Sequence, residues 1–163
     1  MKKAFSLAEL LVVLAIISIV MGTMKVSIQH KRLQASAKAI VEYFNIYRSA
    51  ITMYYFRKGG DLSILESNGR KYLEDIPELD LYRPVGFKSH GTLPISELKS
   101  IAFFRYDGGG IVVEIWLNNE TENYLKLRAE ILNQLGNIPI NPRDANPYYI
   151  EPYIRDDSGN IYL

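Results

Sequence analysis

The residue least expected from its surroundings is Glu9. It lies within a nearly continuous apolar run, residues 4–24, which is bounded by Lys3 and Lys25. About 20 apolar residues are enough to cross a bilayer as a helix, and a carboxylate at the centre of such a helix costs roughly 2.5–3.5 kcal/mol. Glu9 lies closer to the edge of the run, so its cost is lower, but it still needs a positively charged partner. The chemistry indicated is ion pairing in a medium of low dielectric constant.

The residues before Glu9 could supply that partner. Lys2 and Lys3 are followed by Ala4 and Phe5, and Glu9 comes four positions later. This order closely resembles the processing motif of type IV prepilins and type II secretion pseudopilins: a basic leader, a small residue at the cut, an aromatic first mature residue and a glutamate. The resemblance implies that prepilin peptidase cleaves between Ala4 and Phe5, and that the new amino group of Phe5 is then methylated.

Cleavage would turn the amide nitrogen of Phe5 into an amine that is charged at neutral pH. Phe5 and Glu9 are four residues apart and so share a helix face. The amine could pair with Glu9 of its own chain. Pairing with Glu9 of a neighbouring subunit, the idea favoured for pilins, would set the register of a bundle. We hypothesise that cleavage creates the partner that makes Glu9 tolerable inside a filament, so Glu9 is the expected assembly residue.

Two features depart from the family pattern. The residue before the cut is usually glycine, whereas here it is Ala4, which is also small. Many major pilins carry a proline within this helix, but the first proline of this chain is Pro77. Any local melting of the helix in a filament would therefore depend on Gly22.

A single long helix is predicted from Phe5 to Lys58, because this stretch has no proline and only one glycine, and Gly59 and Gly60 then form a stop signal. Such a helix would be about 80 Å long. Its second half carries an apolar stripe at three- and four-residue spacing: Leu33, Ala37, Ile40, Val41, Phe44, Tyr47, Ile51 and Tyr55. We expect this half to pack on a globular domain. A coiled-coil stalk is the alternative, but the stripe is too broad and aromatic for a narrow seam.

The rest of the chain predicts a small α+β head. Residues 100–106 and 111–117 read as a hairpin around a glycine-rich turn, and residues 154–163 as a second hairpin. Between them, a helix is expected to be capped by Asn119 and ended by Gly136. Residues 61–100 predict loops with at most a short helix near residues 70–75.

The expected fold class is therefore α+β and pilin-like: a long N-terminal helix, with a membrane-spanning first half, packed on a small antiparallel β-sheet. The expected parts are a leader peptide (1–4), the transmembrane or filament-core half of the helix (5–25), its amphipathic half (26–58) and the head (59–163).

No catalytic residues are expected, and neither enzymatic activity nor a cofactor. His30 and His90 lie far apart, without metal-ligand spacing. Some pseudopilins bind calcium in their C-terminal loop, and Asp156, Asp157 and Asn160 are oxygen donors of the right type. A plain polar turn is the favoured interpretation, so no metal is predicted.

The formal net charge of +1 comes from 19 basic and 18 acidic residues. A groove that binds nucleic acid normally shows a basic excess, so this balance argues against nucleic acid as a partner. A DNA-uptake filament would need an exposed basic patch to bind DNA. The candidates for such a patch are Arg57, Lys58, Arg70 and Lys71. A solvated face explains them more simply. There is no cysteine, so no disulfide can hold the C-terminal tail.

The favoured function is a structural subunit, either a major or minor pilin or a pseudopilin, of a type IV pilus or type II secretion-like filament. Its partners would be other pilins, prepilin peptidase, an inner-membrane assembly platform and lipid. The subunit would cross the bacterial inner membrane once, with a cytoplasmic N-terminus, and then enter a periplasmic or extracellular filament. The motif implies this orientation, whereas Lys25, Lys31 and Arg32 oppose the positive-inside tendency. The alternative is an uncleaved, membrane-anchored extracytoplasmic binding or sensor domain.

Overall fold

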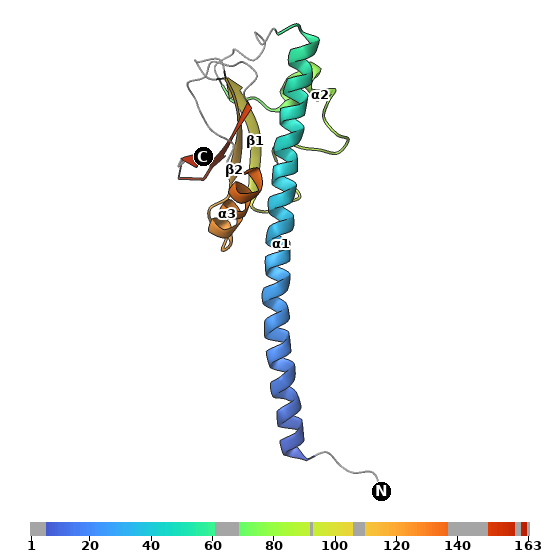
Figure 1. The fold of residues 1–163 in the computed structure, drawn as a ribbon, viewed down its shortest axis with the longest axis vertical. Helices are drawn as coiled ribbons and strands as arrows, with labels where there is room; N and C mark the ends of the chain where they lie inside the picture. The colour runs from blue at the N-terminus through green and yellow to red at the C-terminus, as the bar shows by residue number, and fades with distance from the viewer. Residues whose placement is uncertain are drawn as a thin grey trace.

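A computed structural model describes residues 6–60, 69–91, 93–105, 110–136, 150–158 and 161–162. Its elements are α1 (Leu7–Arg57), η2 (Leu73–Asp75), α2 (Pro77–Asp80), β1 (Leu98–Arg105), β2 (Ile111–Leu117), α3 (Tyr124–Leu135), β3 (Ile150–Arg155) and β4 (Ile161–Tyr162). Figure 1 shows the C-terminal half of α1 lying along the head, while its N-terminal half extends far beyond it. A long helix packed on a small α+β head confirms the predicted fold class, except for one strand pairing described below.

The helix α1 is continuous over 51 residues and is capped at both ends. Ser6 caps its N-terminus with an extended backbone, and Lys58 follows its last turn. Gly59 and Gly60 then adopt φ angles of 63° and 93°, which residues with a side chain rarely adopt. The glycine pair therefore ends the helix where the sequence predicted it would end.

The C-terminal half of α1 buries one face against the head. The buried residues are Ala37, Ile40, Phe44, Tyr47, Ala50, Ile51 and Tyr54. Leu33, Val41 and Tyr55 of the predicted stripe are only partly buried. A step of four residues turns slightly more than one full helical turn. Two such steps in a row, from Tyr47 to Ile51 and on to Tyr55, therefore carry Tyr55 away from the buried face. Tyr54 continues it instead of Tyr55.

Four strands form one mixed sheet in the order β1-β2-β3-β4. The pairs β1–β2 and β3–β4 are antiparallel, as the two hairpins predicted, although the turn residues 106–109 and 159–160 lie outside the described ranges. The expectation of an antiparallel sheet is wrong for the central pair, because β2 and β3 are parallel, with Ile111 opposite Ile150. The chain passes through α3 between these strands, and parallel neighbours need such a crossover.

The helix α3 begins later than predicted. Asn123, not Asn119, occupies its cap position, and Gly136 ends it as expected with a φ of 72°. The preceding turn is organised by Asn118, whose side-chain oxygen accepts a hydrogen bond from the amide of Glu120 at 3.1 Å. This local bond competes with helical geometry, so residues 118–123 form turns before the helix starts.

The outer edge of β1 is covered by the segment that precedes it and by α1. The amide of Ile101 donates to the carbonyl oxygen of Ser89 at 2.8 Å, and the amides of Phe103 and Lys71 each donate to the other's carbonyl oxygen at 2.9 Å. The hydroxyl of Tyr47 donates to the carbonyl oxygen of Ile101 at 2.5 Å. These bonds satisfy groups that a bare edge strand would offer to another chain.

Candidate assembly site and the C-terminal clamp

Ser6 and Glu9 form a reciprocal capping box at the start of α1. The Ser6 amide donates to Oε2 of Glu9 at 2.8 Å, and the Glu9 amide donates to Oγ of Ser6 at 3.2 Å. A cap of this kind stabilises a helix by about 1 kcal/mol. The predicted assembly carboxylate is therefore held at the third helical position by its own chain.

The capping role of Ser6 was not predicted, although the sequence contains a pattern that indicates it. The pattern Ser-x-x-Glu before an apolar run is the signature of a capping box. The two predicted processing residues, Ala4 and Phe5, lie outside the described residues. In sequence, Phe5 is the one residue between the expected cut and Ser6, which caps the helix.

The N-terminal half of α1 is not covered by any other part of the chain that the structure describes. Its large apolar side chains, from Leu7 to Ile28, are exposed. This is the one helix in the described part of the chain that is long and apolar enough to cross a membrane. Its most apolar stretch, near the N-terminus, is not buried at all. Exposed apolar surface of this extent indicates lipid or protein as its natural environment.

Residues 1–24 match the prokaryotic N-terminal methylation motif. This motif is the signature of type IV pilins and pseudopilins, so the predicted resemblance is confirmed. This match supports a type IV pilin-like or pseudopilin-like protein, and the motif points to a structural rather than an enzymatic role. The apolar helix fits anchoring in a membrane before assembly. No curated protein and no solved structure matches the chain.

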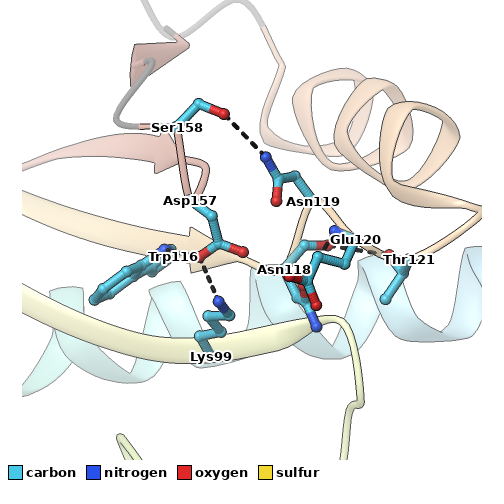
Figure 2. A network of polar contacts seen from close by, with 8 residues as sticks. All are labelled: Lys99, Trp116, Asn118, Asn119, Glu120, Thr121, Asp157 and Ser158. Atoms are coloured by element: carbon cyan, nitrogen blue, oxygen red, sulfur yellow. Dashed lines mark hydrogen bonds and ion pairs between the residues drawn. The ribbon is translucent and has the colours of Figure 1, made fainter.

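A second cluster joins the C-terminal turn of the head to the sheet (Figure 2). We call Lys99, Trp116, Arg155 and Asp157 the C-terminal clamp. The carboxylate of Asp157 accepts hydrogen bonds from the ammonium of Lys99 and from Nε1 of Trp116, the latter at 3.0 Å. Lys99 and Arg155 lie 5.7 and 5.1 Å from the centre of the Trp116 ring, within the range of cation–π attraction.

The two candidate calcium ligands that the structure describes, Asp156 and Asp157, contact other side chains of the head. The hydrogen bond from Lys99 lowers the pKa of Asp157, so this carboxylate is ionised beside an ammonium group. Asp156 is buried and accepts a hydrogen bond from the hydroxyl of Tyr124 at 3.3 Å. Asn160 lies outside the described residues. The two aspartates thus have protein partners, and the cationic position beside Asp157 is taken by Lys99.

Glu114 is a buried charge on the outer face of β2 that the sequence did not single out. Its side chain is 4% exposed and forms a two-point ion pair with Arg70, with Arg155 3.6 Å away. Inside-facing neighbours on β2, Val113 and Ile115, belong to the core, and the two-residue period of a strand places Glu114 on the opposite face. A buried carboxylate between two guanidinium groups ties residue 70 to the sheet.

The remaining predicted candidates do not come together as one site. Arg70, one of four cations considered for DNA contact, is engaged by Glu114, and Arg57 donates to the hydroxyl of Tyr82 at 3.5 Å. His90 packs against the ring of Tyr72, with ring centres 4.2 Å apart. His30 lies on the exposed part of α1.

Proposed function

We propose that this protein is a structural subunit, a major or minor pilin or a pseudopilin, of a type IV pilus or type II secretion-like filament. The observation that carries the proposal is the continuity of the methylation motif at residues 1–24 with a helix whose N-terminal half is wholly exposed. In this proposal residues 1–4 are the leader, residues 5–25 enter the filament core, and residues 26–58 hold the head, residues 59–163.

The proposed mechanism has two steps. Prepilin peptidase cleaves between Ala4 and Phe5 in the inner membrane, and the Phe5 amine is methylated and keeps its charge. That amine then pairs with Glu9 of a neighbouring subunit. The described geometry supports this role, because one carboxylate oxygen of Glu9 is bound by the Ser6 amide while Oε1 forms no hydrogen bond with any described residue. Two opposite charges attract strongly in an apolar bundle, and either one alone is costly there.

The test is the intact mass and N-terminal sequence of the protein purified from its native host, combined with electron microscopy of sheared filaments. A mature chain that begins at methylated Phe5 and is found in filaments is expected. A strain without prepilin peptidase is the control and should yield the chain from Met1. Ala4→Gly should still be cut, whereas Ala4→Leu, which enlarges the residue at the cut, should not.

A chain that begins at Met1 in the wild-type host and stays in the membrane fraction would contradict the proposal. It would favour an anchored binding or sensor domain, in which Glu9 serves only as the helix cap.

A further inference from the structure

Three cations follow the apolar run of α1. We call Lys25, Lys31 and Arg32 the basic collar. All three are exposed, and none takes part in an ion pair with another described residue. The sequence has no carboxylate between Glu9 and Glu42 to balance them. Lys25 and Arg32 share a helix face and border a shallow hollow of about 330 Å³ whose apolar wall includes Met21, Met24 and Ile28.

The complementary charge lies at one end of the head. Glu120 and Glu122 are exposed in the turn that leads into α3. Figure 1 shows α3 at the end of the head that faces the N-terminal half of α1. Neither carboxylate forms an ion pair with a described residue. Among the described residues, the two glutamates on the head and the basic collar on α1 are thus all without an ion-pair partner.

The offset between neighbouring copies can bring these two charges level. If the Phe5 amine of one copy meets Glu9 of the next, parallel copies are shifted by four residues, which is about 6 Å along a helix. The first residue of α1 that the head partly covers in its own chain is Leu33. The same shift moves the lower edge of a neighbouring head to the level of residue 29, so Lys31 and Arg32 then lie beside that head.

We propose that Glu120 and Glu122 of one copy pair with Lys31 and Arg32 of a neighbouring copy of this chain, and that this contact reinforces the register set by the Phe5–Glu9 pair. The inference rests on the proposed filament function and names the surface through which two copies meet. Exposed ion pairs contribute little stability, typically below about 1 kcal/mol each. Their main effect is to select one alignment and reject others.

Cross-linking in assembled filaments tests the contact directly, because the chain has no cysteine of its own. Arg32→Cys and Glu122→Cys are placed in two differently tagged copies, and the filaments are treated with a short bismaleimide linker. A dimer that carries both tags is expected. The matched control replaces Arg32→Cys by Arg48→Cys, which is also exposed on α1 but about 24 Å further along the helix. The control pair should give no such dimer.

Charge reversal supplies the second readout. Lys31→Glu with Arg32→Glu should lose most filaments, and adding Glu120→Lys with Glu122→Lys should restore them, while membrane insertion and N-terminal cleavage stay normal. Wild-type filaments with neither the cross-link nor any loss on reversal would overturn the pairing but leave the proposed function intact. Absence of wild-type filaments would overturn both. If reversal weakens only membrane retention of the unassembled chain, the collar contacts lipid headgroups and the proposal is wrong.

Discussion

Glu9 and Ser6 each hold the other's backbone amide, through bonds of 2.8 and 3.2 Å. The carboxylate therefore has a structural function at the helix N-terminus that does not depend on cleavage. Part of the cost of placing it near the membrane is offset by this bond, because a donor replaces some of the lost water. A capping function and a charge-pairing function can consequently be separated by substitution.

Glu9→Gln should abolish or strongly reduce filaments while leaving membrane insertion unchanged. Glutamine keeps the capping geometry but removes the charge that the Phe5 amine would meet. Glu9→Ala, which removes both functions, should be no more than slightly worse in a quantitative filament assay. Ser6→Ala is the matched control: it should cost the helix about 1 kcal/mol yet still assemble. Normal filaments from Glu9→Gln would show that Glu9 serves only as a cap.

The parts of this fold that could be predicted depend on local patterns. The absence of proline before the Gly59–Gly60 stop defines α1, and the apolar runs around a glycine-rich turn define β1 and β2. The parallel pairing of β2 and β3 could not be derived in this way, because it depends on where α3 returns the chain. The clamp between Lys99 and Asp157, which are 58 residues apart, likewise follows from tertiary packing.

Tyr47→Phe should lower the free energy of unfolding by about 1–3 kcal/mol, because the carbonyl oxygen of Ile101 would lose its buried donor. Burial raises the pKa of Tyr47 well above that of a free phenol. The unfolded chain would therefore ionise first, so stability present below about pH 10 should fall as the pH rises further. Urea unfolding of the full chain in detergent at pH 7 and above pH 10 measures both effects.

The variant Tyr47→Phe should show a shallower loss of stability above pH 10 than the wild type. Tyr82→Phe is the control, since its hydroxyl contacts only the exposed Arg57 among the bonds described above. Equal stability of Tyr47→Phe and Tyr82→Phe would mean that the bond from α1 to β1 contributes nothing measurable.

Asp157→Asn should loosen the C-terminal turn and shift the emission of Trp116, the only tryptophan in the chain. In the wild type the pKa of Asp157 is lowered by Lys99, so the clamp contributes stability above the ordinary aspartate pKa of about 3.9 and loses it as the pH falls through the lower, folded value. An acid titration of Trp116 fluorescence should show this transition, and Asp157→Asn should not.

Calcium should have little effect on the clamp. The ammonium of Lys99 already neutralises Asp157, so we expect the unfolding temperature to be the same in calcium and in chelator. Lys99→Met is the informative variant, because it removes the charged partner of Asp157 and leaves the hydrogen bond from Trp116 in place. A calcium-dependent rise in the wild-type unfolding temperature would instead favour Asp156, Asp157 and Asn160 as ligands.

Gly22→Ala should make the helix stiffer without a steric penalty. An added Cβ at this position meets no atom within 4 Å, and the backbone is helical. Alanine is favoured over glycine inside a helix by about 1 kcal/mol. If Gly22 permits local melting when subunits assemble, amide exchange over residues 20–26 of wild-type filaments should be fast, and Gly22→Ala should slow it several-fold. Ala15→Gly, elsewhere in the apolar run, controls for a general change in helicity. Slow exchange around Gly22 in wild-type filaments would mean that α1 stays helical throughout, and that this chain needs neither a proline nor a glycine break to assemble.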